Sequence, residues 1–392
     1  MINLFHDVDP EQYIIATYYV QSTTTLKEAA LNIAIGQSVG NPKERNTWET
    51  DELFLKHSCV VTQITAMIDD KAGLIDIAFP AANTDFATDG ISHLLCQLMG
   101  GQLDIGIIEK CQLMNLRIPE IVKNEFKKNM GINSIREKTV CFDKPLLGGI
   151  IKPKTGLDEP MLKSMVEQMA SNGINFIKED EIMSNLPSFP LQERVKALQP
   201  ILEYHKDVIY AFCINSDPLY LGDRVKTVVD NGGNGVHINI HSGFGSYRCI
   251  RDIAPNLYIH YQKSGDKLIT NIKHDYHIRW RVLCQLAVLS GVDFIHAGML
   301  GGYANDNIEA LTDCFEILVD GNVLPALSCG MHPGLVDAIR KVFGNQWMAN
   351  VGGALHGHPG GTGAGVRAMR QAIDGNHGEE YEQAIAKWGY TT

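Results

Sequence analysis

Charged residues follow a short apolar run near the middle of the chain. Residues 174–177 read Ile-Asn-Phe-Ile, which is typical of a β-strand, and Lys178-Glu179-Asp180-Glu181 comes directly after them. Four charged residues pack poorly in a protein core, so their position at the end of a buried strand indicates chemistry. Carboxylate oxygens are the ligands that a hard divalent cation such as Mg²⁺ prefers. Asp180 and Glu181 therefore predict a metal site.

Short apolar strands alternate with helices from about residue 147 onward. Helices are expected over ranges such as 160–172 and 278–290, and eight strands are expected to begin near Gly149, Ile174, Val208, Val236, Leu257, Asp293, Val323 and Trp347. Eight strand–helix units in about 245 residues predict a (β/α)8 barrel, whose active sites lie at the C-terminal ends of the strands.

The preceding part of the chain has a different order of elements. Helices are expected over 26–37 and 90–99, and strands over 13–20, 59–68, 74–79 and 103–113. The order β-α-β-β-α-β is that of the ferredoxin-like split unit. The predicted fold class is α/β, with an N-terminal ferredoxin-like α+β domain at residues 1–138 and a C-terminal (β/α)8 TIM barrel at residues 139–392.

Composition excludes several classes of protein. A net charge of -11 argues against binding to nucleic acid. Nine cysteines without a C-x-x-C pair predict free thiols in a reducing compartment. The sequence has no apolar run of the ~20 residues that a membrane span needs, and residues 1–7 do not resemble a signal peptide. A cytoplasmic protein without membrane or nucleic-acid partners is expected.

Polar residues or glycines end six of the eight expected strands. They are Lys152, the Lys178–Glu181 run, His260, His296, Ser328 and the Gly352-Gly353 pair. Each has a structural explanation when taken alone, such as a solvated lysine, a charge at a helix N-terminus or a glycine turn. Because a barrel core is filled by apolar layers, their occurrence together predicts one active-site mouth.

Lys152-Pro153-Lys154 followed by the K-x-D-E pattern at Lys178 resembles the active site of RuBisCO large chains and RuBisCO-like proteins, and the resemblance covers nearly the whole chain. It implies that a carbamate formed from CO₂ on Lys178 binds Mg²⁺ together with Asp180 and Glu181. It also implies that Lys152 handles the proton at the enediolate carbon, with Lys154 beside it.

The same resemblance implies a set of substrate contacts. His260 would lie beside the substrate hydroxyls and His296 would contact a phosphate. The remaining matches are Ser328 and Gly330 in a variant S-G-G motif, Gly352 and Gly353 as backbone N–H donors to a phosphate, and the pair Thr47-Trp48. This last pair would reach into a partner's active site, which implies a homodimer or an assembly of dimers with no small subunit.

Four positions depart from the pattern of a carboxylase. Tyr303 stands where a lysine should steady the incoming CO₂, and Gln37 stands where that lysine's glutamate partner should be. Tyr261 follows the strand-five histidine in place of an arginine that binds a second phosphate. Gly101 replaces a substrate-contacting asparagine, and it also replaces the lysine base of the diketo-methylthiopentyl-phosphate enolases in this superfamily.

These observations predict a form IV type RuBisCO-like enzyme with Mg²⁺ as its cofactor. It would enolise a singly phosphorylated sugar-like ketone and then isomerise or decarboxylate it, without productive CO₂ fixation. Three alternatives stay open: a genuine ribulose-1,5-bisphosphate carboxylase, a catalytically inactive ligand-binding relative, and an unrelated barrel enzyme in which Lys178 forms a Schiff base.

Overall fold

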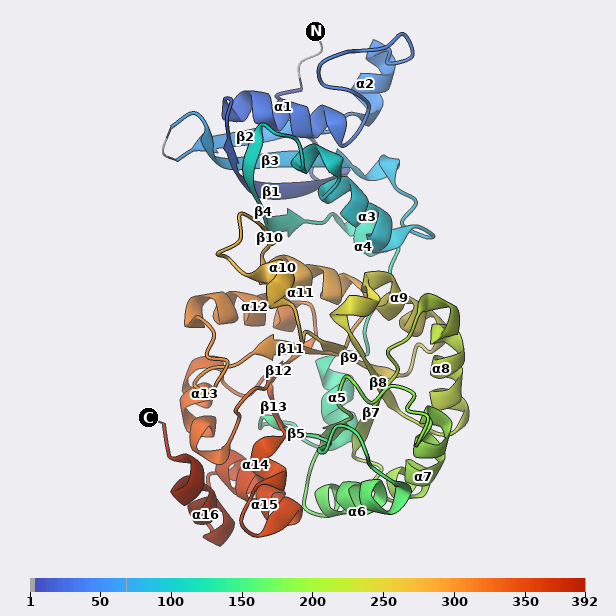
Figure 1. Cartoon of the computed structure of the whole chain (residues 1–392), viewed down its shortest axis with the longest axis vertical. Helices are drawn as coiled ribbons and strands as arrows, with labels where there is room; N and C mark the ends of the chain where they lie inside the picture. Colours follow the sequence, from blue (N-terminus) through green and yellow to red (C-terminus); the bar gives the residue numbers. More distant parts are fainter. Residues whose placement is uncertain (1–3, 68, 392) are drawn as a thin grey trace. The chain divides into compact units, whose positions relative to one another are not determined.

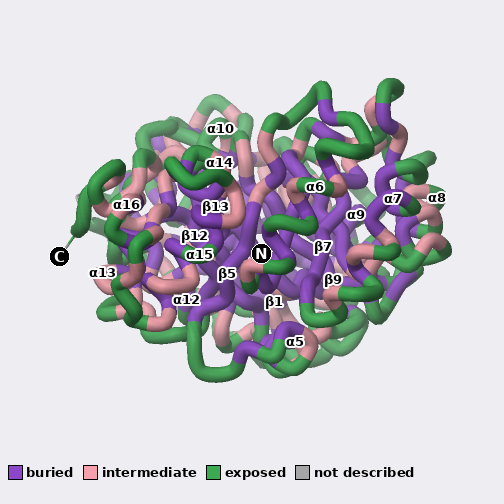
Figure 2. Tube along the Cα trace, turned by 90° about the horizontal axis from the view of Figure 1, so that it is seen from below, coloured by how far each residue is buried: buried purple, intermediate pink, exposed green. Residues whose placement is uncertain are grey.

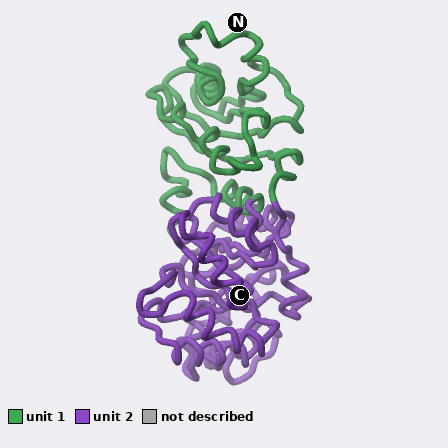
Figure 3. The backbone as a smooth tube through the Cα atoms, turned by 90° about the vertical axis from the view of Figure 1, so that its right-hand side faces the viewer, with its two compact units in different colours: residues 1–126, 265–289 green, residues 127–264, 290–392 purple. Residues whose placement is uncertain are grey.

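The computed structural model describes residues 4–67 and 69–391, and it divides the chain into two compact units. Unit 1 consists of the first 126 residues and residues 265–289, and unit 2 consists of residues 127–264 and 290–392 (Figure 3). The expected boundary between residues 138 and 139 concerns separate folding domains and stays a prediction.

Unit 2 contains a closed barrel of eight parallel strands (Figure 1). In sequence order they are β5 (Leu146–Ile150), β6 (Phe176–Lys178), β7 (Ile209–Cys213), β8 (Gly235–Asn239), β9 (Tyr258–Gln262), β11 (Phe294–Gly298), β12 (Leu324–Leu327) and β13 (Met348–Val351). Each corresponds to one of the strands expected from the sequence. The predicted (β/α)8 barrel is confirmed.

Apolar side chains fill the barrel interior near the N-terminal ends of its strands. Phe176, Phe294 and Met348 belong to one buried cluster with Ile132 and Ile135 of helix α5 (Gly131–Thr139). Figure 2 shows the barrel strands as buried. Because apolar layers already fill this part of the interior, polar side chains at the C-terminal ends of the strands contribute little to packing and are available for chemistry.

Helices surround this barrel. They are α6 (Glu159–Ala170), α7 (Leu191–Tyr204), α8 (Pro218–Asp230), α9 (Phe244–Ile253), α12 (Ile308–Asp320), α13 (Val336–Phe343), α14 (Gly353–His356), α15 (Gly361–Asp374) and α16 (Glu379–Trp388). Side-chain caps fix two of the loop-to-helix junctions. Asp158 accepts a hydrogen bond from the Met161 N–H at the start of α6, and Asn307 accepts one from the Ala310 N–H at the start of α12.

Unit 1 is built on a five-stranded sheet in the order β10-β4-β1-β3-β2. Its strands are β1 (Tyr13–Ser22), β2 (Val60–Ala66), β3 (Ala72–Pro80), β4 (Ile108–Arg117) and β10 (Tyr276–Ile278), and its main helices are α1 (Leu26–Gly36) and α3 (Gly90–Leu98). The expected β-α-β-β-α-β order is present. The predicted end of the second strand at Ile68 lies outside the described residues.

Several elements of unit 1 were not expected from the sequence. They are α2 (Asp51–His57), α4 (Glu120–Lys123), α10 (Lys267–Thr270) and strand β10, which pairs in parallel with β4. Helix α11 (Trp280–Leu289) was expected as a barrel helix, but it groups with unit 1. Gln285 of α11 donates to the Leu116 carbonyl at 2.8 Å and accepts from the Leu116 N–H at 3.1 Å, which holds α11 against β4.

The free thiols expected from the composition are present in the structure. All nine cysteines lie in the described part of the chain and are free thiols. Within residues 4–67 and 69–391, no helix combines the length and apolar character that crossing a membrane requires.

Candidate active site

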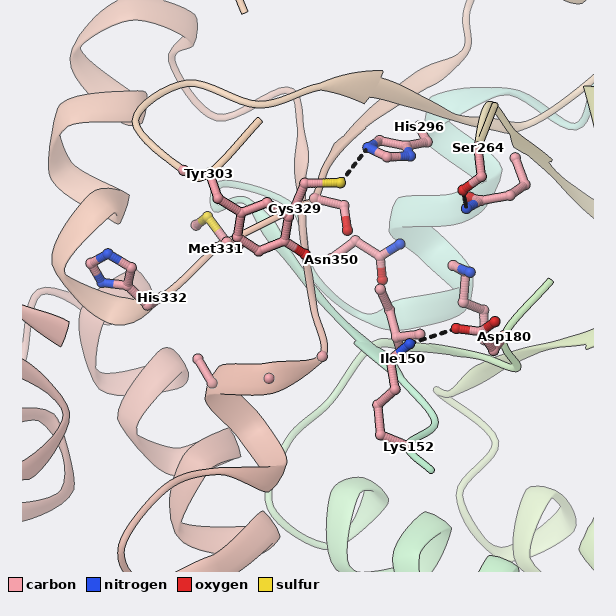
Figure 4. A pocket seen from close by; sticks show the side chains of 18 of the residues that line it. Ile150, Lys152, Asp180, Ser264, His296, Tyr303, Cys329, Met331, His332 and Asn350 are labelled. Atoms are coloured by element: carbon pink, nitrogen blue, oxygen red, sulfur yellow. Dashed lines mark hydrogen bonds and ion pairs between the residues drawn. The ribbon is translucent and has the colours of Figure 1, made fainter. Parts of the chain in front are cut away.

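A cavity of about 450 Å³ opens at the C-terminal ends of the barrel strands in unit 2. Figure 4 shows side chains from several strand ends facing it. The residues expected at the site that line this cavity are Lys152, Lys154, Lys178, Asp180, Glu181, His296, Ser328, Gly330, Gly352 and Gly353. They come from strands far apart in the sequence, so the expected convergence on one mouth exists in the fold.

Lys178 ends β6 and its side chain is only 1% exposed. Its Nζ donates to the Glu179 carbonyl at 3.2 Å and lies 4.0 Å from Glu181 Oε2. Burial lowers the pKa of Lys178 from its ordinary value, against the opposing effect of the Glu181 and Asp180 charges. A lower pKa increases the share of neutral amine, which is the form that can react with CO₂ to give a carbamate.

Asp180 is held by two lysines. Its Oδ2 lies 2.5 Å from Lys152 Nζ and 3.9 Å from Lys154 Nζ (Figure 4). Burial alone would raise the pKa of Asp180, but the hydrogen bond from Lys152 and the charges of Lys152, Lys178 and Lys154 bring it below its usual value. Asp180 is therefore ionised and able to act as an oxygen ligand.

Glu179 has a different role from its neighbours. Its carboxylate is fully buried, with Oε1 2.7 Å from Arg194 Nε and Oε2 3.0 Å from Arg194 Nη2. The Cys213 N–H also donates to Glu179 Oε2 at 2.8 Å. This ion pair joins β6 to helix α7 and strand β7. Of the three consecutive carboxylates, Asp180 and Glu181 line the cavity and Glu179 supports the fold.

The donor set fits a hard divalent cation when Lys178 is carbamylated. Among the described residues, no group of three or more His, Cys, Asp or Glu side chains is arranged to hold a metal ion. Asp180 and Glu181 supply two carboxylates on one wall of the cavity. A carbamate on the buried Lys178 would supply a third protein oxygen, and water or substrate oxygens would complete the octahedral shell that Mg²⁺ prefers.

The opposite wall contains His296, Ser328 and Cys329. His296 Nε2 lies 3.8 Å from Cys329 Sγ. Burial, followed by the charges of Lys263 and Lys178, lowers the pKa of His296 well below its usual value, so the imidazole is neutral. Cys329 has φ = 81°, a left-handed conformation that residues with a side chain seldom adopt.

His260 does not reach the wall of this cavity, and the expected contact with substrate hydroxyls needs correction. Its ring stacks on Phe176 and Phe294 in the barrel interior, with centroid separations of 5.6 Å and 6.4 Å. Strand β9 continues to Gln262, two residues beyond the predicted end, and Gln262 lines the cavity. Side chains two residues apart share a face of a strand, so Gln262 occupies the layer above His260.

Tyr261 also needs correction, because it does not occupy the place of a phosphate-binding arginine. It is fully buried, and its ring stacks on Tyr247 of α9 with centroids 4.8 Å apart. Its side chain therefore faces the surrounding helices. Lys263 comes next after β9; it is 8% exposed, and its Nζ lies 3.5 Å from the Ala297 carbonyl. A cation is thus present close to His296.

Gly352 and Gly353 leave the backbone open at the end of β13. A Cβ atom on Gly353 would have no neighbour within 4 Å, and one on Gly352 would lie 3.5 Å from Lys152 Cε. The short helix α14 begins at Gly353. This exposed backbone is compatible with the expected role in phosphate binding, which stays a prediction.

Tyr303 lies in the segment between β11 and α12 and lines the cavity with 86% of its surface exposed. Gly330 has φ = +102°, and a Cβ atom there would come within 2.7 Å of the Tyr303 N atom. The absence of a side chain at Gly330 therefore lets Tyr303 pack over the Cys329 segment (Figure 4). A phenol occupies this side of the cavity mouth.

Other residues singled out from the sequence belong to unit 1. Trp48 is 84% exposed and Thr47 precedes it. The Gln37 carboxamide is used inside the unit: it donates to the Gln97 carbonyl at 2.5 Å and accepts from the Gln102 N–H at 3.2 Å. The expected role of Thr47 and Trp48 in a partner's site stays a prediction.

Comparison with known proteins extends over both units. The model of the ribulose bisphosphate carboxylase large chain N-terminal domain matches residues 6–122, and the model of its catalytic domain matches residues 131–321 and 317–390.

Some of the relatives are named as enolases and others as carboxylases. A 2,3-diketo-5-methylthiopentyl-1-phosphate enolase of Exiguobacterium sibiricum is 29% identical, over 97% of this chain and 99% of the relative. A ribulose bisphosphate carboxylase of Pyrococcus furiosus is 27% identical, over 99% of this chain and 97% of the relative. The sequence lies at a similar distance from both.

The fold is that of a solved octameric ribulose-1,5-bisphosphate carboxylase/oxygenase from Pyrococcus horikoshii, with a TM-score of 0.89 and 24% identity over 98% of this chain and 95% of that one. The barrel, the N-terminal mixed sheet and the matching family models agree. The chain belongs to the family of the ribulose bisphosphate carboxylase large chain.

Proposed function

We propose that this chain is a RuBisCO-like enzyme that enolises a singly phosphorylated, sugar-like ketone without productive CO₂ fixation. The observation that carries the proposal is the wall formed by Lys178, Asp180 and Glu181, with Lys152 Nζ 2.5 Å from Asp180 Oδ2. Such a wall combines oxygen ligands with a lysine that can move a proton, which are the two requirements of enolisation.

Lys178 carbamate, Asp180 and Glu181 would hold Mg²⁺, which when bound would polarise the ketone and its neighbouring hydroxyl. A carbamate oxygen on Lys178, or the amine of Lys152, would accept the proton from the carbon beside the ketone. The positive charges of Lys152 and Lys154 then stabilise the enediolate. Return of the proton to another carbon completes an isomerisation, whereas a β-keto acid would lose CO₂.

Support for a single phosphate comes from one of the two kinds of relative. The Exiguobacterium sibiricum enolase is named for a monophosphate. The replacement of an arginine by Tyr261 does not bear on the number of phosphates, because that side chain faces away from the cavity. Either the Gly352-Gly353 backbone or His296 with Lys263 would bind this phosphate.

The proposal does not extend to the substrate of that enolase. Gly101 has no side chain to serve as the lysine base that this activity requires in the family pattern. A carboxylase is disfavoured by Tyr303, because a phenol cannot supply the positive charge that stabilises a new carboxylate. The Pyrococcus furiosus relative keeps a carboxylase as the second candidate.

We further propose that the active enzyme is at least a homodimer. Trp48, which the family pattern places in a partner's active site, is 84% exposed in the single chain. The related Pyrococcus horikoshii protein is octameric. A monomer would then lack Thr47 and Trp48 at its phosphate site.

Proton NMR in D₂O with Mg²⁺ and bicarbonate tests the proposal, using a panel of ketose monophosphates, ketose bisphosphates and phosphorylated β-keto acids. Deuterium entry or CO₂ loss on a monophosphate, with ribulose 1,5-bisphosphate unchanged, is the expected result. Conversion of ribulose 1,5-bisphosphate to phosphoglycerate would establish the carboxylase instead. Absence of any reaction, together with failure to bind Mg²⁺ or phosphate, would support an inactive ligand-binding protein.

A further inference from the structure

We propose that Asn350 is a specificity-determining residue that binds adjacent oxygen atoms of a polyhydroxylated substrate. The inference rests on the proposed function, because it describes the substrate class of the same cavity. Asn350 belongs to β13 and lines the cavity, while its residue is only 1% exposed. Figure 4 shows its carboxamide among the cavity side chains.

The position of Asn350 follows from the geometry of β13. Met348, two residues earlier, belongs to the apolar cluster inside the barrel. Side chains alternate along a strand, so Asn350 lies on the same inner face, one layer closer to the mouth. Gly148 is its partner on β5, and a Cβ atom there would lie 3.2 Å from Asn350 Oδ1. The glycine leaves room for the carboxamide.

Neither polar atom of this carboxamide has a protein partner. Among the described residues, Asn350 Nδ2 and Oδ1 are both buried without a hydrogen bond. Burying an amide in this state is unfavourable, whereas a leucine of similar shape would avoid the penalty. A structural role therefore does not explain an asparagine here. A ligand that fills the cavity would satisfy both atoms.

The neighbours of Asn350 indicate which part of a ligand it meets. Strand β13 pairs with β12 on one side and with β5 on the other. Ser328 follows β12, and Lys152 follows β5 and is paired with Asp180. Asn350 thus lies between the proposed metal wall and the wall that contains His296. A ligand that spans the two walls would place its central carbons beside the carboxamide.

An asparagine side chain offers one acceptor and two donor hydrogens in a fixed plane. Two adjacent hydroxyls match it: one oxygen accepts from Nδ2–H and its neighbour donates to Oδ1. A chain with ketones and no hydroxyl, such as the diketone named for the Exiguobacterium sibiricum enolase, would leave Oδ1 without a donor. The cavity therefore favours a polyhydroxy ketone phosphate.

Calorimetric titration with matched probes tests this assignment. D-Ribulose 5-phosphate and D-xylulose 5-phosphate carry adjacent hydroxyls, and 5-hydroxy-4-oxopentyl phosphate has the same chain without them. The homogeneous wild-type protein, loaded with Mg²⁺ and bicarbonate, should bind at least one diol probe about tenfold more tightly than the dideoxy probe, since two hydrogen bonds are at stake. Asn350→Leu, with Asn350→Ser as a second variant, should abolish this preference.

Thermal unfolding separates recognition from a structural role. Asn350→Leu should leave the Tm unchanged or raise it. Asn175→Leu is the matched control, because Asn175 is also buried but its Oδ1 accepts from the Leu147 N–H at 3.0 Å and its Nδ2 donates to the Thr139 carbonyl at 3.4 Å. That control should lower the Tm and keep the probe preference.

Several outcomes would overturn the assignment: wild-type protein that binds the probes equally or binds none, a preference that survives in Asn350→Leu, or a Tm loss in that variant equal to the control's. The proposed function is judged separately by deuterium exchange. A diol preference that depends on Asn350, without exchange into any probe, would reject enolisation and keep the recognition role. Equal exchange into the diol and dideoxy probes, with equal binding of both, would support enolisation and reject the recognition role of Asn350.

Discussion

Lys152 Nζ lies 2.5 Å from Asp180 Oδ2, and the two residues follow neighbouring barrel strands. The carboxylate of Asp180 is also a proposed ligand of Mg²⁺. Lys152 and a divalent cation therefore compete for Asp180, since both positive charges are stabilised by one carboxylate. Because of this competition, a substitution of Lys152 should change proton transfer and metal binding in opposite directions.

Lys152→Met should lose deuterium exchange and bind divalent cations more tightly. Removal of a positive charge at this distance should strengthen binding by about tenfold, because charges a few ångströms apart near a surface interact by about 1–4 kcal/mol. Titration with Mn²⁺ followed by electron paramagnetic resonance measures the affinity. Asp180→Asn is the control and should weaken binding. Weaker binding in Lys152→Met would contradict the arrangement.

Glu179 and Glu181, on either side of Asp180, should respond differently to the same change. Glu179→Gln breaks a fully buried ion pair with Arg194 and should lower the free energy of unfolding by about 3–5 kcal/mol. Glu181→Gln should keep most of the stability, because this side chain is 22% exposed and lines the cavity, but it should lose Mg²⁺-dependent exchange. Urea unfolding and exchange assays compare them. Equal stability loss in the two variants would remove the distinction.

The positions of site residues were predicted correctly where the end of the preceding strand was predicted correctly. Lys178 to Glu181 could be placed because a clear apolar strand precedes them, and the end of β6 at Lys178 agrees with the prediction. Glu179 could not be separated from its neighbours, since its partner Arg194 is distant in sequence and belongs to another element.

On β9 the prediction failed because it ended the strand two residues too early. His260 was then taken for the mouth residue, although Gln262 is the residue that lines the cavity. The positions that share a face with His260 could be predicted from the alternation of side chains. The residue at which the strand ends could not be predicted from the sequence. Strand β10 was missed for another reason: it is three residues long and pairs with β4, far away in sequence.

Stability should fall as the pH is lowered through about 6.5, where histidines of the unfolded chain take up protons. Burial lowers the pKa of His237, His260 and His296 well below the usual value, so the folded protein does not take up these protons there. The unfolded state binds more protons below pH 6.5, and each such histidine reduces the free energy of unfolding by up to about 1.4 kcal/mol per pH unit.

His260→Phe tests this pH dependence, since a phenyl ring can replace the imidazole between Phe176 and Phe294. The urea midpoint of the variant should fall less than that of the wild type between pH 7.5 and pH 5.5. An identical fall in both proteins would mean that His260 is protonated in the folded state.

Anion binding should depend on Lys263 and not on Tyr261. Lys263→Met removes a buried cation near His296 and should weaken binding of inorganic phosphate about tenfold, as expected for one charged hydrogen bond. Tyr261→Phe should leave the affinity unchanged, because its ring packs against Tyr247 outside the barrel wall. Calorimetric titration with phosphate measures both. A loss of phosphate affinity confined to Tyr261→Phe would indicate that residue 261 does occupy the phosphate-binding position.

Deuterium exchange into a ketose monophosphate, compared between the wild type and Lys178→Ala, tests the central claim most directly. The wild type should exchange only with both Mg²⁺ and bicarbonate present, and without label from ¹⁴CO₂ entering the product. Lys178→Ala should lose the exchange by at least about 10²-fold, the smallest contribution typical of a positioned general base. Full exchange in Lys178→Ala would contradict the account.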